Sequence, residues 1–297
     1  MKYLIFTFVL LSASLSRAVV GGKAVNDIAI IKALGLSYSS YRNDLDTPAI
    51  PIGPRVAITC GHCVSGGNPM GTAGDVGAQI VYPPQMKKDT DETAEAYSRL
   101  PAGTYGLPFF EKANFSYDLA LVILNKGEHY RRPYMSIGRK QVSLHEKLIF
   151  LGKGLNASIT NQFCGGYISN SHWFAVAPFK VLDFYSQKVG FILTGKPAAT
   201  CPYDSGGYYF RAEPDGTIKL VGINSWGTQN GTQLVSRFGA VRNLQGFLSG
   251  ADDLTSPLIR EWMSKVIAGK GAHVCGLNKV CGPIPSPFSN TVTDAKL

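Results

Sequence analysis

The chain has 297 residues, six of them cysteines, and a formal net charge of +9 at pH 7. Apolar residues make up 45% of the sequence and charged residues only 16%, a balance that indicates a folded globular protein and excludes an intrinsically disordered one. The basic residues are spread along the chain in clusters as short as Lys87-Lys88, so the positive charge indicates no nucleic-acid-binding module.

The first 18 residues have the pattern of a secretory signal peptide. Lys2 precedes an apolar run at 3–11 that is too short to span a bilayer, and the small residues Ser16 and Ala18 stand where a signal peptidase cuts. We therefore expect an exported protein, extracellular or periplasmic, whose mature chain begins at Val19. No membrane anchor is expected further along the sequence.

Most of the following segments are short, rich in apolar residues and bounded by Gly, Pro, Asn or Asp, a pattern typical of β-barrels. Asp215-Gly216 separates two strand-like runs and predicts a β-hairpin. Strands are predicted at residues 28–38, 55–59, 79–82, 119–124, 147–151, 173–181, 189–194 and 207–211.

One helix is predicted near the end of the chain, at 257–268. Ser256 is a suitable N-cap, Pro257 suits the first helical position, and Gly269 suits the stop. A tail at 270–297 follows, with two cysteines and then Pro- and Ser-rich sequence. We expect it to form a disulfide-closed loop with a loose end.

Three short stretches carry the residue types of nucleophilic catalysis. Ser205 lies in C-P-Y-D-S-G-G, where a sharp turn can expose the hydroxyl and direct neighbouring backbone N–H groups at one point. A base and an orienting carboxylate precede it: His62 in T-C-G-H-C-V and Asp118 in Y-D-L-A-L-V-I-L. Asp and Gly around a serine more often mark an ordinary turn, but the order His, Asp, Ser is a known order of the catalytic triad. The combination favours acyl transfer.

These stretches resemble the trypsin and chymotrypsin-like serine proteases, and the resemblance covers residues 19 to about 268. V-V-G-G from Val19 resembles the mature amino terminus of the family, and N-S-W-G from Asn224 resembles the strand that pairs with the substrate backbone. The resemblance implies an all-β, chymotrypsin-like fold of two six-stranded antiparallel barrels, with a C-terminal helix and a short disulfide-closed tail. The expected domains are a signal peptide at 1–18, a protease domain at 19–269 with its barrel boundary near 130, and an extension at 270–297.

The resemblance also assigns roles to the catalytic residues. His62 would take the proton from Ser205, Asp118 would hold the tautomer of His62, and Ser225 would support Asp118. The expected substrates are proteins or peptides, and the enzyme would be a monomer that needs no cofactor or metal.

The residues around the nucleophile receive further roles from the resemblance. The ammonium group of Val19 would pair with Asp204 and order the oxyanion loop, in which Tyr203 and Ser205 would supply the two N–H groups. The family has glycine where this chain has Tyr203, and the backbone conformation there suits glycine best. Two hypotheses therefore stand: a serine endopeptidase, and a weak or inactive homologue that acts as a binding protein.

The resemblance places Ala199 at the floor of the pocket that selects the residue before the cut. No carboxylate stands there, so cleavage after Lys or Arg is not expected, and large apolar residues are favoured. Arg237 and Thr200 leave a preference for acidic residues open. The expected substrate-binding residues are Ala199, Ser225, Trp226 and Gly227.

Six cysteines in an exported chain predict three disulfides, for which fifteen pairings exist. The favoured pairs are Cys60–Cys63, Cys164–Cys201 and Cys275–Cys281. The sequence C-G-H-C at 60–63 also matches the motif of thiol-disulfide oxidoreductases, although the βαβ context of such a site is missing. An exported oxidoreductase is therefore a third hypothesis.

Overall fold

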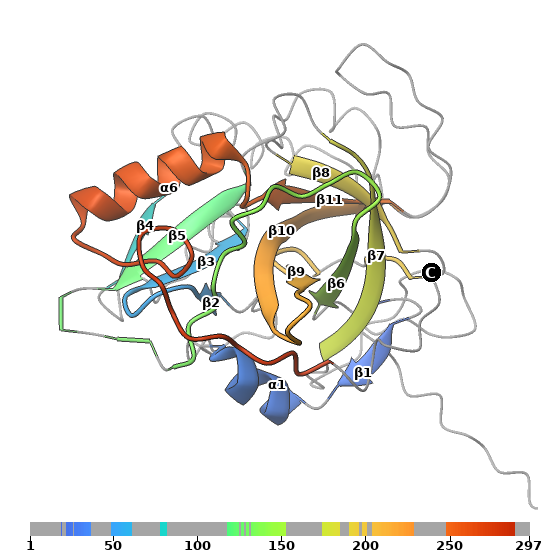
Figure 1. Ribbon diagram of the computed structural model, residues 1–297, viewed down its shortest axis with the longest axis horizontal. Helices are drawn as coiled ribbons and strands as arrows, with labels where there is room; N and C mark the ends of the chain where they lie inside the picture. Colours follow the sequence, from blue (N-terminus) through green and yellow to red (C-terminus); the bar gives the residue numbers. More distant parts are fainter. Residues whose placement is uncertain are drawn as a thin grey trace, which may run out of the picture.

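The structure is a computed structural model. It describes residues 19, 22–25, 27–36, 49–60, 78–81, 118–124, 126–127, 129–130, 132–152, 174–184, 190–195, 198–200, 204–228 and 248–288. These residues form mostly strands, arranged in two sheets, with one helix at 27–34 and another at 257–269 (Figure 1).

The larger sheet contains a closed antiparallel barrel. Its strand order is β7-β6-β9-β10-β11-β8, and β8 also pairs with the last residues of β7, which closes the barrel, while β1 pairs with the first residues of β7 (Figure 1). The strands of this sheet are β1 Lys23–Val25, β6 Lys147–Gly152, β7 Phe174–Phe184, β8 Gly190–Thr194, β9 Tyr208–Ala212, β10 Ile218–Thr228 and β11 Leu248–Asp253.

The second sheet has the antiparallel order β2-β3-β5-β4. Every residue of β3 and β5 is buried, which explains why both strands are almost continuously apolar rather than alternating. The strands are β2 Ile50–Pro51, β3 Val56–Cys60, β4 Ala78–Val81 and β5 Leu119–Leu124.

Most of the predicted elements are confirmed within these ranges, and with them the all-β class. The hairpin at Asp215-Gly216 joins β9 to β10, and Gly216 has the positive φ of 77° that such a turn needs. The strand predicted at 28–38 is wrong, because the chain forms helix α1 Asp27–Leu34 there. Ile30 and Leu34, four residues apart, are both buried, so the apolar residues have the period of a helix. The described part of the second sheet has four strands.

The two faces of the barrel strands pack into two different cores. Alternate residues of the strands form an interior cluster in which Phe150 and Tyr209 lie with ring centroids 4.7 Å apart. The opposite face, with Ile149 and Phe210, joins a second cluster that also contains β3, β5 and α6. Because successive side chains of a strand point to opposite faces, one face of the barrel strands lines the barrel interior and the other packs against the second sheet.

Helix α6 Pro257–Gly269 begins where the sequence predicts, but its cap differs from the expectation. Ser256 occupies the N-cap position without a side-chain hydrogen bond to the helix, and its buried hydroxyl has no partner in the structure. The helix is held by its apolar face instead, because Ile259, Met263 and Ile267 recur every fourth residue and are buried.

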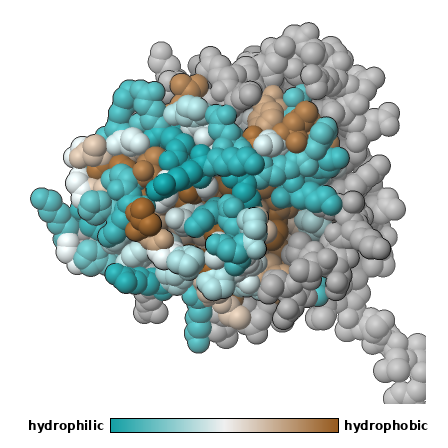
Figure 2. Space-filling model, viewed as in Figure 1, coloured by the Kyte–Doolittle hydropathy of each residue, from teal (hydrophilic) through white to brown (hydrophobic). Residues whose placement is uncertain are grey.

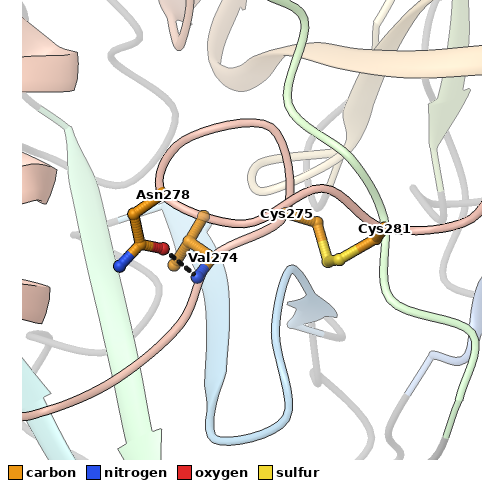
Figure 3. The surroundings of a disulfide bond; sticks show 4 residues. All are labelled: Val274, Cys275, Asn278 and Cys281. Atoms are coloured by element: carbon orange, nitrogen blue, oxygen red, sulfur yellow. Dashed lines mark hydrogen bonds between the residues drawn. A yellow bond between two sulfur atoms is a disulfide. The ribbon is translucent and has the colours of Figure 1, made fainter.

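The tail after α6 crosses from the smaller sheet to the barrel. Cys275 N–H donates to the carbonyl of Ile52 (2.7 Å), and Ile218 N–H donates to the carbonyl of Ile284 (3.0 Å). The disulfide joins Cys275 to Cys281, the pairing that the sequence favours (Figure 3).

Beyond the disulfide the tail is not loose as far as residue 288, contrary to the expectation. Phe288 is fully buried, with its ring 5.8 Å from that of Phe210. The apolar residues of the segment, not visible as a periodic pattern in the sequence, hold it against the barrel.

The face of the molecule in Figure 2 is mainly hydrophilic, with small apolar areas separated by polar ones. Among the described residues, the large apolar side chains that are exposed are Leu144, Leu258 and Val280.

The buried position of Phe288 leads to a stability prediction. We expect Phe288→Ala to lower the free energy of unfolding by about 3–5 kcal/mol, because it removes a buried ring and leaves a cavity. The measurement is urea unfolding followed by tryptophan fluorescence. Val280→Ala is the control, since Val280 is 80% exposed in the same tail and its loss should leave stability nearly unchanged. Equal, small effects of both changes would show that the tail does not belong to the core.

Candidate active site

Ser205 lies on a turn that β10 holds in place. Gly206 has φ 77°, and its N–H donates to the carbonyl of Asn224 (2.7 Å). In return, Asn224 N–H donates to the carbonyl of Gly207 (2.8 Å), and the Asn224 side chain donates to the carbonyl of Asp204 (3.1 Å). The glycine is required at the positive φ, and the hydrogen bonds fix the serine at the edge of the barrel.

Ser225 on β10 connects this turn to Asp118. The Ser225 hydroxyl donates to the Asp118 Oδ2 (2.6 Å), and the Ser225 carbonyl accepts a long hydrogen bond from the Ser205 hydroxyl (3.5 Å). Asp118 is 5% exposed and directly precedes β5. The structure thus places two of the three predicted catalytic residues, from two different sheets, around Ser225, which the sequence analysis expects to support Asp118.

His62 lies outside the described residues. Strand β3 ends at Cys60, which pairs with Leu119, the residue after Asp118. The position of His62 stays a prediction.

Several other predicted site residues lie outside the described residues. They are Tyr203, Cys63, Cys164 and Cys201, and the side chain of Trp226 lies outside them as well. Cys60 is buried and disulfide-bonded to a cysteine beyond the described ranges.

Val19 and Asp204, the predicted activation pair, are both fully buried in the barrel half of the structure. Val19 belongs to the interior cluster with Phe150. The Asp204 carboxylate lies so close to Gly152 that a Cβ there would overlap it. The pairing of the Val19 ammonium with this carboxylate stays a prediction.

The predicted substrate pocket contains two hydroxyls that the sequence analysis did not place there together. Thr200 and Ser249, both buried, share a hydrogen bond of 2.7 Å between their hydroxyl oxygens. The Thr200 hydroxyl also occupies the space that a side chain at Gly227 would need. Ala199 is buried as well. Ser249 could have been found only from the pairing of β11 with β10.

Tyr209, below this pair, donates a hydrogen bond to the Asn224 side-chain oxygen (3.1 Å). Burial raises the pKa of Tyr209 well above its usual value, and the charge of Asp204 adds to the rise. The tyrosine therefore stays neutral and acts as a donor that orients Asn224.

Strand β11 ends in two adjacent buried carboxylic acids, Asp252 and Asp253. Burial raises the pKa of Asp252 well above its usual value, and the nearby charge of Asp118 raises it further. Burial also raises the pKa of Asp253, to about 6, against the lowering effect of hydrogen bonds from Thr255. The sequence G-A-D-D gave no sign that these acids would be buried near Asp118.

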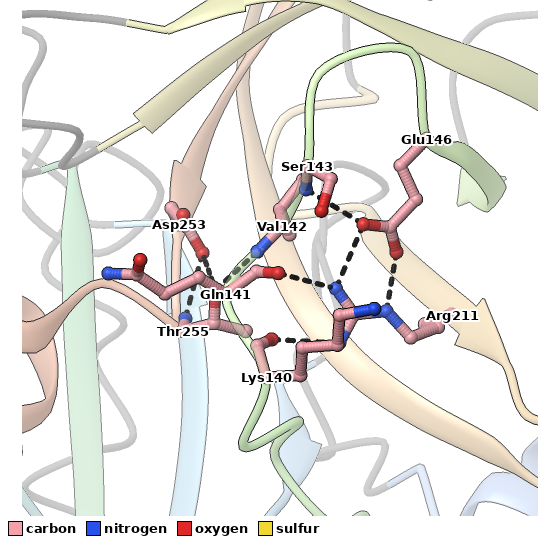
Figure 4. Close-up of polar contacts among 8 residues, drawn as sticks. All are labelled: Lys140, Gln141, Val142, Ser143, Glu146, Arg211, Asp253 and Thr255. Carbon is pink, nitrogen blue, oxygen red and sulfur yellow. Dashed lines mark hydrogen bonds and ion pairs between the residues drawn. The ribbon is translucent and has the colours of Figure 1, made fainter.

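The two acids belong to different surroundings. Asp253 accepts hydrogen bonds from the Thr255 N–H (2.8 Å) and hydroxyl (2.5 Å), on the side where Arg211 pairs with Glu146 (Figure 4). Asp252, the preceding residue on the strand, lies near Asp118 instead, and the charge of Asp118 raises the pKa of Asp252.

No group of three or more metal-ligating side chains lies among the described residues. A helix long and apolar enough to cross a membrane is likewise absent from the part of the chain that the structure describes.

The closed barrel, the second sheet and the C-terminal helix are consistent with a chymotrypsin-like double-barrel fold. No family model matches the sequence, and no curated protein matches it. Among solved structures, the chain is similar to neuropsin, a serine protease expressed in the limbic system of mouse brain. The identity is 16%, the match covers 74% of this chain and 88% of neuropsin, and the TM-score is 0.43. This likeness is too low to support an argument about the site, which rests on the contacts given above.

The raised pKa of Asp253 leads to a prediction about stability and pH. Between about pH 4 and pH 6 the folded protein keeps a proton that the unfolded chain has released, so the free energy of unfolding falls as the pH rises. Asp253→Asn keeps an oxygen that accepts from Thr255 but cannot ionise. We expect the free energy of unfolding of the variant to fall by about 3 kcal/mol less than that of the wild type over this pH range. The measurement is urea unfolding at each pH.

Asp215→Asn is the control for this experiment. Hydrogen bonds from Thr217 lower the pKa of the exposed Asp215, so its loss should change the pH dependence in the opposite direction. Parallel curves for wild type and Asp253→Asn would contradict the prediction.

Proposed function

We propose that this protein is a secreted serine endopeptidase that hydrolyses peptide bonds through Ser205, His62 and Asp118. One observation carries the proposal: Ser225 donates to Asp118 while its carbonyl accepts from Ser205. The nucleophile and the orienting carboxylate come from separate sheets, and an ordinary turn at Ser205 would not need to meet a buried aspartate there.

The proposed reaction begins when His62 takes the proton from the Ser205 hydroxyl, which attacks the carbonyl carbon of the substrate. Asp118, held by Ser225, keeps the proper tautomer of His62 and stabilises the imidazolium that forms. The amine leaves with a proton from His62, and an acyl group remains on Ser205. Water then attacks this ester with His62 again as the base, and the acid product leaves.

The oxyanion that forms in each step would be stabilised by the backbone N–H groups of Ser205 and Tyr203. The Tyr203 position is the reason to keep a second candidate function, a homologue that binds peptides without cleaving them. Losing one oxyanion donor typically lowers the rate by about 10²–10³.

The oxidoreductase hypothesis is not supported. Cys60 is buried at the end of a strand in an antiparallel sheet, whereas a reactive thiol of that class lies in a βαβ unit and is partly exposed.

Export and processing before Val19 are part of the proposal. The complete burial of Val19 in the barrel interior supports a mature domain that starts at this residue. The proposed substrates are proteins or peptides that meet the enzyme after export.

The test of function is labelling of the purified protein with a fluorophosphonate, which reacts with activated serines. We expect the wild type and Ser143→Ala, a change at an exposed serine, to be labelled and Ser205→Ala to remain unlabelled. Absence of labelling in the wild type would favour the binding protein. Labelling of Ser205→Ala would place the reactive group elsewhere.

The pocket predicts a preference for apolar residues before the cut, because no carboxylate accompanies the hydroxyls of Thr200 and Ser249 among the described residues there. The Thr200 hydroxyl against Gly227 limits the room for a large ring. In a peptide-library digest we expect cleavage after Leu, Met, Phe or Tyr, and a larger share of Phe and Tyr for Thr200→Ala. Dominant cleavage after Lys or Arg would show that the pocket is misassigned, and cleavage after Glu would support the acidic preference.

A further inference from the structure

Asp252 is a buried carboxylic acid that the proposed reaction does not use. It is 1% exposed, and neither of its carboxylate oxygens has a hydrogen-bond partner among the described residues. A buried, unpaired carboxylate is costly, so the position calls for a physical explanation.

The strand register places Asp252 beside the catalytic contact. On β10, Ile223 stands opposite Asp252, and Ser225, two residues further, donates to Asp118. The main-chain N–H of Asp118 faces the Asp252 carboxylate and partly opposes the rise in its pKa, without reaching the geometry of a hydrogen bond. Asp252 and Asp118 therefore form a pair of buried acids.

The charged groups that face Asp252 are acidic. Asp118 approaches from the segment before β5, and Asp253 lies next to it on β11. The neighbouring strand β8 contributes Gly190 opposite Asp252, and neither β8 nor β5 carries a charged residue. No cation among the described residues is placed to offset a second negative charge at this point.

Two carboxylates in one buried site do not both ionise near neutral pH, so the pair holds one proton. The hydrogen bonds decide which acid keeps it. Asp118 accepts a 2.6 Å hydrogen bond from Ser225, which favours its ionised form, whereas Asp252 accepts none. The proton therefore belongs on Asp252.

We propose that Asp252 is a positioning residue for the triad: it stays protonated while Asp118 is ionised, and its own ionisation tunes the basicity of His62. This inference rests on the proposed protease function, because it acts through Asp118 on His62. As the pH rises, loss of the Asp252 proton adds a negative charge beside Asp118. That charge stabilises the imidazolium form of His62, and because it appears only above neutral pH, it changes kcat/KM on the alkaline side of the pH profile.

The first experiment compares the pH dependence of kcat/KM for the wild type and Asp252→Asn. The wild type should show an inflection on the alkaline side of the profile, where Asp252 loses its proton. The variant cannot add the second charge, so we expect it to lack this inflection and to keep the wild-type midpoint of the acid limb. Asp253→Asn is the matched control on the same strand. It removes an equally buried acid that contacts Thr255 instead, and should keep the alkaline inflection. An alkaline inflection that Asp252→Asn retains, or a wild type without one, overturns the proposal, since a merely structural role would alter stability and leave the pH profile unchanged.

The second experiment does not depend on activity or on a change at Asp252. Carbon-13 NMR of the aspartate carboxyl groups in the Ser205→Ala protein, assigned through the backbone, follows each proton directly. We expect Asp118 to ionise at lower pH than Asp252, and Asp118→Asn to lower the titration midpoint of Asp252 by about one unit or more. The proposal is overturned if Asp252 ionises at lower pH than Asp118, or if Asp118→Asn leaves the titration midpoint of Asp252 unchanged.

The two experiments separate the failure of the inference from the failure of the function. A wild type that neither cleaves peptides nor reacts with the fluorophosphonate removes the proposed protease, while the carboxyl titration still decides whether the acids share a proton. A labelled wild type whose alkaline inflection survives Asp252→Asn leaves the protease and removes the role of Asp252.

Discussion

The hydrogen bond from Ser225 to Asp118 is the contact on which the arrangement of the site depends. Ser225 belongs to the barrel and Asp118 to the second sheet, so the bond requires the two sheets to meet at one place. The outer face of the barrel supplies that meeting, because its apolar residues pack in the same cluster as β3, β5 and α6. The position of Ser205 relative to Asp118 is thus a consequence of how the sheets pack, rather than of the turn at Ser205 alone.

Burial at this junction has an electrostatic cost that the structure distributes unequally. Asp118 accepts a hydrogen bond and Asp253 accepts two, while Asp252 accepts none. An acid without donors is stable in the interior only when it is neutral. The packing that buries Asp118 therefore also determines which of its acidic neighbours can carry charge.

The sequence predicts well the features that depend on local pattern. The apolar runs predicted strands β3, β5 and β6, and the Asp215-Gly216 dipeptide predicted the hairpin. The apolar face of α6 predicted the C-terminal helix. The short run at 28–38 was misinterpreted because a few apolar residues fit a strand and a helix equally well.

The features that the sequence did not reveal depend on residues far apart in the chain. Thr200 and Ser249 meet only because the strand β11 lies beside β10, and Phe288 is buried only because the tail crosses the barrel. The burial of Asp252 follows from the pairing of β11 with β10, where it stands opposite Ile223, and the local sequence does not show it. Catalytic motifs are local and therefore visible, whereas the surroundings that adjust them are not.

The cluster between the sheets has a further consequence for how the chain folds. It contains Ile30 from α1, Ile58 from β3 and Phe288 from the tail, so its contacts join both ends of the described chain. Contacts between such distant residues close large loops before they gain any burial, which slows folding. Each of the segments on either side of residue 130 would, when alone, expose the residues that it contributes to this cluster. The two halves are thus one cooperative folding unit, although each has a sheet of its own.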